Sequence, residues 1–141
     1  MGLSDRTAPK VAVLLGGVSA EREVSLSTGR ECAAALRGEG FEVIEVDAGP
    51  DLAMRLAEIS PDVVFNALHG RWGEDGCVQG LLEWMQIPYS HSGVLASALA
   101  MDKEKSKAAF RAHGLPVAES RLANKSDIRS RHIIPPPEVV K

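Results

Sequence analysis

The sequence has no apolar run that approaches the roughly 20 residues of a membrane-spanning helix. Its first residues, 1–10, are polar and lack the apolar stretch of a secretory signal. We therefore expect a cytoplasmic protein without a membrane partner, and we predict that residues 1–9 form a flexible leader.

Excess positive charge is also missing, because 16 lysines and arginines stand against 19 aspartates and glutamates. The formal net charge is -3 at pH 7 with neutral histidines. Nucleic acids bind clustered basic side chains, so this balance predicts no nucleic-acid partner.

Cysteine is scarce, since Cys32 and Cys77 are the only two and they form no C-x-x-C pair. Isolated thiols of this kind are typical of a reducing compartment rather than of a disulfide scaffold. We expect both to be buried and reduced. We assign no residue as a metal ligand.

Strand and helix patterns alternate from residue 10 onward. Apolar runs predict strands at about residues 10–15, 41–46, 62–66 and 87–89. Amphipathic or small-residue stretches predict helices at about residues 22–37, 52–60, 78–85, 94–100 and 103–113. This order predicts an α/β fold with a Rossmann-like, doubly wound parallel sheet.

The residues that orient and cap these helices are also predicted. We expect Val24, Ala33 and Leu36 to face inward from the first helix. Asp51 and Asp102 precede two other helices, where a carboxylate caps the free N–H groups.

Two loops are predicted to meet at one edge of the sheet. With the strand order 2-1-3-4, the first and third strands are neighbours at a topological switch point. The loops that leave their carboxyl ends, residues 16–25 and 68–76, then face one crevice.

The first of these loops is glycine-rich, yet it matches neither G-x-x-x-x-G-K-[ST] nor G-x-G-x-x-G. Glu21 lies near the helix start, where its carboxylate would repel a phosphate and attract a cation such as an ammonium group. The alternative is a plain tight turn in which Glu21 and Glu23 favour the positive end of the helix.

The second loop, Leu68 to Gly76, holds three glycines, an imidazole, a guanidinium and two carboxylates. Loops of this density are usually functional. His69 is suited to hydrogen bonding with a carboxylate or an acyl phosphate, and Gly70 allows the backbone to approach a ligand. A structural role for His69, and pairing among Arg71, Glu74 and Asp75, remain as alternatives.

The composition changes after Leu115, where no strong periodicity remains until an apolar strand pattern begins at residues 138–141. Lys103 belongs to a charged helix start whose simplest interpretation is a solvated face. Lys141 ends the strand pattern, where a lysine either extends to solvent or meets a phosphate.

The motif series as a whole resembles the amino-terminal part of bacterial D-alanine-D-alanine ligases. The motifs that carry the resemblance are GGVSAEREVSL at residues 16–26, ALHG at 67–70, GEDG at 73–76, PY at 88–89, SGV at 92–94 and MDK at 101–103. One departure is His91, where many relatives have glycine.

The resemblance implies the domain organisation. Residues 10–101 would form a pre-ATP-grasp domain that binds the first D-alanine. Residues 102–141 would form a connecting helix and the beginning of an ATP-grasp domain that is incomplete here. It also implies a homodimer formed through helices of the first domain.

The implied reaction joins two D-alanines through an acyl phosphate made with ATP and Mg²⁺ or Mn²⁺, for peptidoglycan precursor synthesis. By the resemblance, Glu21 and His69 are the catalytic residues and both bind substrate: Glu21 holds the ammonium group of the first D-alanine, and His69 lies near its carboxylate and stabilises the acyl phosphate. The remaining implied contacts are substrate binding by Val24, Ser25 and Gly70, and ATP binding by Lys103 and Lys141.

Two rival functions remain at this point. Ligases that make D-alanyl-D-lactate or D-alanyl-D-serine share these motifs. A stand-alone α/β binding or dimerisation module, with no catalytic partner, is the alternative of another class.

Overall fold

The computed structural model describes residues 8–130, which fall into two compact units, 8–101 and 102–130. The predictions that concern residues 1–7, the strand pattern at 138–141 and the role of Lys141 lie outside the described residues.

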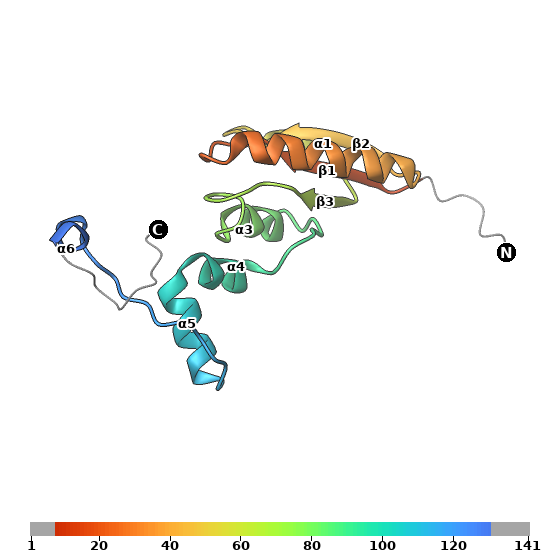
Figure 1. The fold of residues 1–141 in the computed structure, drawn as a ribbon. Coiled ribbons are helices and arrows are strands. Elements are labelled where there is room, and N and C mark those ends of the chain that lie inside the picture. Colours follow the sequence, from red (N-terminus) through yellow and green to blue (C-terminus); the bar gives the residue numbers. More distant parts are fainter. Residues whose placement is uncertain (1–7, 131–141) are drawn as a thin grey trace. The chain divides into compact units, whose positions relative to one another are not determined.

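The first unit is an α/β fold around a parallel sheet (Figure 1). Its elements are β1 (Lys10–Leu15), α1 (Arg22–Gly38), β2 (Glu42–Asp47), α2 (Leu52–Ile59), β3 (Val63–Asn66), α3 (Cys77–Trp84) and α4 (Val94–Met101). The strand order is β2-β1-β3, and both pairs are parallel. The predicted fold class and the adjacency of the first and third strands are confirmed.

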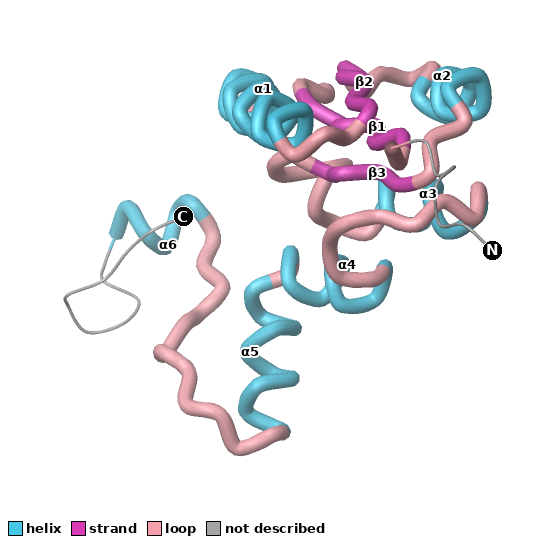
Figure 2. Tube along the Cα trace, turned by 90° about the vertical axis from the view of Figure 1, so that its right-hand side faces the viewer, coloured by secondary structure: helices cyan, strands magenta, loops and turns pink. Residues whose placement is uncertain are grey.

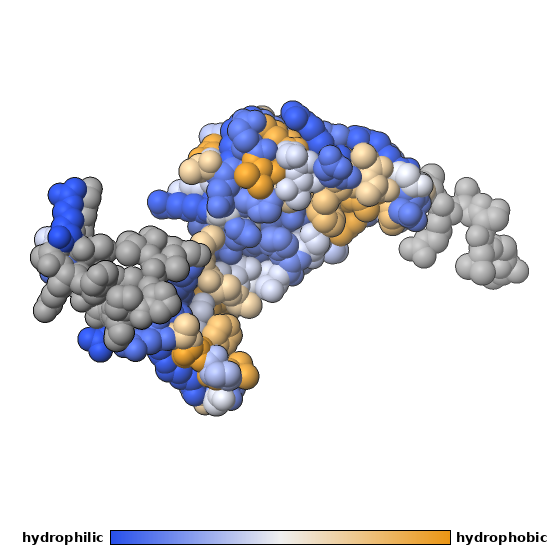
Figure 3. Space-filling view, in the orientation of Figure 1, coloured by the Kyte–Doolittle hydropathy of each residue, from blue (hydrophilic) through white to orange (hydrophobic). Residues whose placement is uncertain are grey.

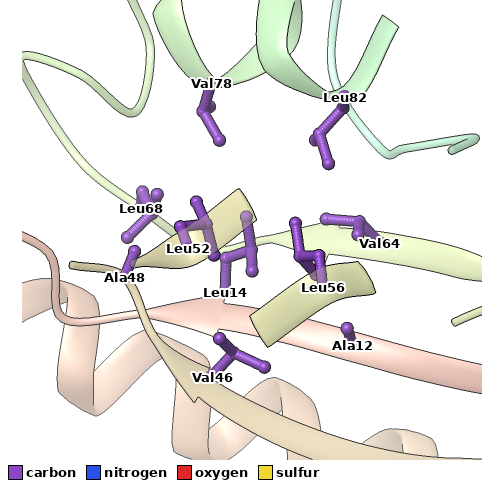
Figure 4. Close-up of a cluster of buried hydrophobic side chains, with 10 residues drawn as sticks. All are labelled: Ala12, Leu14, Val46, Ala48, Leu52, Leu56, Val64, Leu68, Val78 and Leu82. Carbon is purple, nitrogen blue, oxygen red and sulfur yellow. The ribbon is translucent and has the colours of Figure 1, made fainter. Parts of the chain in front are cut away.

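The central strand β1 is buried on both faces, as its continuous apolar run predicts. Ala12 and Leu14 pack with residues of α2 and α3, whereas Val13 and Leu15 pack with α1. Figure 2 shows α1 and α2 on opposite sides of the sheet. In Figure 4, Leu52 and Leu56 from α2 and Val78 and Leu82 from α3 surround Leu14.

The predicted fourth strand is wrong, because Tyr89 forms only an isolated parallel bridge with Val64 on the free side of β3. The bridge cannot lengthen backwards, since Pro88 has no N–H to donate. It does not lengthen forwards either, since the Asn66 N–H donates to the Ser90 side-chain Oγ at 3.0 Å instead of a carbonyl.

The inward face of α1 matches the prediction in part: Ala33 is buried and Leu36 packs against the core, but Val24 does not face inward. Its buried residues are Ser25, Gly29 and Ala33, whereas Val24 is 57% exposed. A Cβ built on Gly29 would collide with the Cβ of Leu15, so the helix lies very close to β1. Small residues therefore mark this inward stripe, and the apolar residue Val24 points away from it.

Two smaller predictions, the burial of the cysteines and the cap by Asp51, are not fully confirmed. Cys32 is half-buried and Cys77 is exposed, and both thiols are free, so the expected burial of Cys77 is wrong. Asp51 precedes α2, but its carboxylate makes no capping hydrogen bond. Over residues 8–130, no helix has the length and apolar character needed to cross a membrane.

The second unit contains α5 (Lys103–Ala112) and α6 (Lys125–Ser130). The Asp102 carboxylate accepts hydrogen bonds from the N–H groups of Glu104 and Lys105, so the predicted cap is confirmed. Gly114, with φ of 71°, follows the end of α5. The short helix α6 was not predicted, because its six residues are too few to show a helical period.

The close contact between α1 and β1 generates a stability prediction. We expect Gly29→Ala to destabilise the protein by about 1–3 kcal/mol, because the added methyl group overpacks against Leu15. Gly38→Ala is the matched control in the same helix, since nothing lies within 4 Å of a Cβ there. Urea denaturation of both variants measures the difference, and equal midpoints would contradict the close packing.

Candidate functional site

The structure brings the two predicted loops together at the carboxyl ends of β1 and β3. Ser19 Oγ donates a hydrogen bond to the His69 carbonyl oxygen at 2.8 Å. Ser25 Oγ, buried in α1, donates to the Ala67 carbonyl oxygen at 2.8 Å. His69 Nε2 lies 3.1 Å from Thr28 Oγ1, so α1 also orients the imidazole ring.

Glu21 lies immediately before α1, with its side chain directed against the second loop. Its backbone N–H donates to Ser19 Oγ at 3.1 Å. A Cβ built on Gly70 would lie only 2.5 Å from Glu21 Oε2, and Gly70 has a φ of 68°. Glycine at position 70 is thus what allows the carboxylate to approach this loop.

The Glu21 carboxylate has no cationic partner among residues 8–130, where the ion pairs involve other side chains. The side chain is exposed. An exposed carboxylate beside a loop that carries hydrogen-bonding groups is suited to binding a cation from solution.

The second loop is held by its own carboxylates rather than by ion pairs with Arg71. Glu74 Oε2 accepts a hydrogen bond from the Gly70 N–H at 2.6 Å. The two Asp75 oxygens accept from the N–H groups of Trp72 and Cys77 at 3.0 and 3.1 Å. Arg71 instead stacks on the Trp72 ring, 4.5 Å from its centroid.

The electrostatics of Asp75 agree with this structural role. Burial alone would raise the pKa of Asp75, but the N–H groups of Trp72 and Cys77 hold it below its ordinary value. The same contact with Asp75, together with burial, raises the pKa of the Cys77 thiol. The thiol is therefore less reactive than an ordinary cysteine at neutral pH.

The glycine turn is fixed from the side of β2 by an ion pair between Arg22 and Asp47. Arg22 Nη1 and Nη2 donate to Asp47 Oδ1 and Oδ2 at 2.7 and 2.5 Å. Arg22 Nη1 also donates to the Gly17 carbonyl oxygen at 2.9 Å, and the Gly17 N–H donates to Asp47 Oδ1 at 3.2 Å. The hydrogen bond from Arg22 holds the pKa of Asp47 below its ordinary value, against the opposing effect of burial.

A pocket of about 380 Å³ lies beside these loops. It is bounded by the glycine turn, the β2–α2 connection, the second loop and the start of α3. Ser19 and His69 line it, whereas Glu21 and Gly70 do not. The exposed carboxylate and this largely apolar hollow are therefore different parts of the same sheet edge.

A buried amide pair supports the second loop, and sequence reasoning missed it. Asn66 Nδ2 and Gln79 Nε2 both donate to the Gly73 carbonyl oxygen at 2.9 Å. Both amides also lie near His91 Nδ1, at 3.2 and 3.4 Å. His91 has a φ of 125°, a conformation that favours glycine.

The remaining predicted site residues are placed as follows. Val24 is exposed on the first turn of α1, and Ser25 is buried with its hydroxyl turned to the sheet. Figure 3 shows apolar patches among the polar residues on the surface of α1. Lys103 is exposed at the start of α5 in the second unit. Within residues 8–130, no group of three His, Cys, Asp or Glu side chains is placed to hold a metal ion.

Comparison with known proteins matches these features to one family. Residues 47–92 match the family model described as D-ala D-ala ligase N-terminus. The chain is 73% identical over 141 residues to a D-alanine-D-alanine ligase of Ruegeria sp. strain TM1040, covering 46% of that protein. It is 74% identical to the one from Ruegeria pomeroyi, again covering 46%.

Solved structures agree with the sequence comparison. The D-alanine-D-alanine ligase of Bacillus anthracis is 42% identical and superposes with a TM-score of 0.67, over 76% of this chain and 35% of that chain. A second structure of that protein, complexed with ATP, has the same TM-score and identity and is covered to 38%.

The doubly wound sheet, with two interacting loops at its switch point, defines a Rossmann-like α/β domain. The chain is similar to the amino-terminal part of D-alanine-D-alanine ligases, both in its match to that family model over residues 47–92 and in its identity to the Ruegeria proteins. It spans about half the length of the curated relatives it matches.

The Arg22–Asp47 ion pair generates a pH prediction. The folded pKa of Asp47 is lowered, so its stabilising effect is complete above the unfolded pKa of about 3.9 and is lost as the pH falls through the folded value. We expect the unfolding free energy to differ most between wild type and Asp47→Asn above about pH 5, and less below about pH 4. Urea titrations across this range measure the difference, and a pH-independent difference would contradict the assignment.

Proposed function

We propose that this chain is the part of a D-alanine-D-alanine ligase that binds the first D-alanine. The whole enzyme would join two D-alanines at the expense of ATP for peptidoglycan precursor synthesis in the cytoplasm. The observation that carries the proposal is the Glu21 carboxylate, which is exposed, lies against Gly70 and has no cationic partner in the described part of the chain.

Each loop residue has a role in this proposal. Glu21 accepts hydrogen bonds from the substrate ammonium group, a charge-assisted interaction. His69 is held through Nε2 by Thr28 and stabilises negative charge that develops on the acyl phosphate. Val24 and Gly70 border the bound amino acid, and Ser25 supports the second loop through Ala67.

ATP phosphorylates the carboxylate of the first D-alanine, and the amine of the second attacks the acyl phosphate to give the dipeptide. ADP and phosphate leave. In the proposal Lys103 and Lys141 bind ATP phosphates as point charges. The ATP complex of the Bacillus anthracis relative supports ATP as the co-substrate. Within residues 8–130 no cluster of three His, Cys, Asp or Glu side chains is placed to hold Mg²⁺.

A homodimer is part of the proposal. Trp84 at the end of α3 is 88% exposed and Leu95 in α4 is 73% exposed. Exposed large apolar residues on neighbouring helices support association of this unit with a second copy.

The rival functions differ in what the intact protein makes. A ligase that accepts D-lactate or D-serine as second substrate would give a different product with the same first site. A non-catalytic module would correspond to a reading frame with no ATP-grasp domain, so the gene sequence beyond Lys141 separates it from an enzyme.

The first test concerns turnover by the 141-residue chain. We expect it to form no D-alanyl-D-alanine from D-alanine, ATP and Mg²⁺ at a rate comparable to a full-length ligase, because most of the ATP site lies elsewhere. Chromatographic product analysis measures the rate, with the Ruegeria pomeroyi relative as positive control. Comparable turnover would contradict the proposal that this chain is only a substrate-binding part.

The second test concerns Glu21. In a ligase whose amino-terminal part is this sequence, we expect Glu21→Gln to weaken binding of the first D-alanine about 10- to 100-fold, because a charge-assisted hydrogen bond is lost. ATP affinity should change by less than about twofold. Calorimetric titration measures both constants.

Glu23→Gln is the matched control, because it removes the same charge two residues further along the exposed start of α1. It should leave both constants near those of the wild type. Equal losses of D-alanine and ATP affinity in Glu21→Gln would count against the assigned role.

A further inference from the structure

The turn that carries Glu21 is anchored at two points. On one side Ser19 Oγ accepts from the Glu21 N–H and donates to the His69 carbonyl oxygen. On the other side Arg22, the next residue, forms the ion pair with Asp47 at the end of β2. The Glu21 carboxylate itself has no ion-pair partner in residues 8–130, so these neighbouring contacts set its position.

The Arg22–Asp47 pair is built onto the backbone of the turn. Arg22 donates to the Gly17 carbonyl oxygen, and Asp47 accepts from the Gly17 N–H. Both backbone polar groups of Gly17 are therefore hydrogen-bonded to the ion pair. Gly16, with φ of 70°, leaves the room for this, because a Cβ there would collide with Asp47 Oδ1 and with Arg22 Nη1. Arg55 Nη1 donates to the Asp47 carbonyl oxygen at 2.7 Å, which ties the pair to α2.

We propose that Arg22 and Asp47 are positioning residues of the amino-acid site, which hold the glycine turn so that Glu21 faces the substrate ammonium group. This inference rests on the proposed function of Glu21. Neither residue lies among those assigned to substrate contact. Their effect acts through the turn and therefore on D-alanine affinity.

The chain contains a matched comparison for this role. Arg37 and Glu45 form a second ion pair between α1 and β2, with Nη1 and Oε1 2.8 Å apart. The side chains of the two pairs are exposed to similar degrees, 42% and 45% for Arg22 and Asp47 against 48% and 33% for Arg37 and Glu45. Exposed ion pairs contribute little to stability, so both should contribute similarly.

Only the Arg22–Asp47 pair binds both the N–H and the carbonyl oxygen of a residue in the turn. A purely structural ion pair would therefore behave like Arg37–Glu45, whereas a positioning pair would change the site. Asp47→Asn is the sharpest variant, because it keeps the shape of the side chain but presents an N–H₂ group to the Arg22 fork in place of an acceptor.

The experiment uses the ligase of the Glu21 test, whose amino-terminal part is this sequence, labelled with ¹⁵N. D-alanine is titrated into wild type, Asp47→Asn, Arg22→Lys and Glu45→Gln, and dissociation constants are taken from the amide shifts of Glu21 and Gly70. Hydrogen exchange of the Gly17 amide and the urea midpoint are measured on the same samples. The Gly17 amide reports the turn without any ligand.

We expect Asp47→Asn to weaken D-alanine binding about tenfold and to speed Gly17 amide exchange, while Glu45→Gln changes neither by more than about twofold. Arg22→Lys, which keeps the charge but loses the bidentate fork, should fall between wild type and Asp47→Asn. The urea midpoints of Asp47→Asn and Glu45→Gln should decrease by similar amounts. A loss of D-alanine affinity in Asp47→Asn alone, with similar losses of stability in both variants, distinguishes a positioning role from general support of the fold.

Equal effects of Asp47→Asn and Glu45→Gln on affinity and on Gly17 exchange would overturn the inference. A wild-type ligase that shows no D-alanine shifts at Glu21 and Gly70 would instead overturn the proposed function of Glu21. In that case unchanged Gly17 exchange and an unchanged Glu21 amide shift in Asp47→Asn would overturn the anchoring of the turn as well.

Discussion

The close approach of α1 to the sheet is the constraint on which the candidate site depends. Gly29 and Ala33 allow the helix to lie against β1, with no room for a methyl group over Leu15. At this separation the Ser25 hydroxyl reaches the Ala67 carbonyl oxygen and Thr28 reaches the imidazole of His69. Larger side chains at positions 29 and 33 would move α1 away from β1 and separate the two loops. Packing in the core therefore determines the geometry of the candidate site at the edge of the sheet.

The architecture of the first unit could be predicted from the sequence because its physical signals are local. A continuous apolar run such as residues 10–15 is what a strand buried on both faces requires, and glycines mark the ends of α1 and α5. The prediction that Val24 faces inward was wrong, because α1 approaches β1 through the small residues Ser25, Gly29 and Ala33. The predicted fourth strand was wrong for a different reason. Whether residues 87–89 form a strand depends on the hydrogen-bond partners of Val64 and Asn66, which the local sequence does not reveal.

The site was only partly accessible to sequence reasoning. The charge of Glu21 at a glycine turn indicated a cation, and the density of polar groups marked the His69 loop. Contacts between distant residues carried no such signal: Asp47 lies 30 positions from Gly17, and Asn66 lies 25 positions from His91. An Asn at the end of an apolar strand is nevertheless a usable sign of a buried amide, because its side chain needs hydrogen-bond partners in the core.

The position of Asp47 has a consequence for how this fold relates to nucleotide-binding proteins. In dinucleotide-binding folds a glycine turn receives phosphates, and a carboxylate further along the chain binds the ribose hydroxyls. Here the corresponding carboxylate, Asp47, accepts hydrogen bonds from Arg22 and from the Gly17 N–H, and the glycine turn is followed by Glu21. Where a dinucleotide-binding fold presents N–H groups to an anion, this edge of the sheet presents the exposed Glu21 carboxylate, which in the proposed function meets a cation.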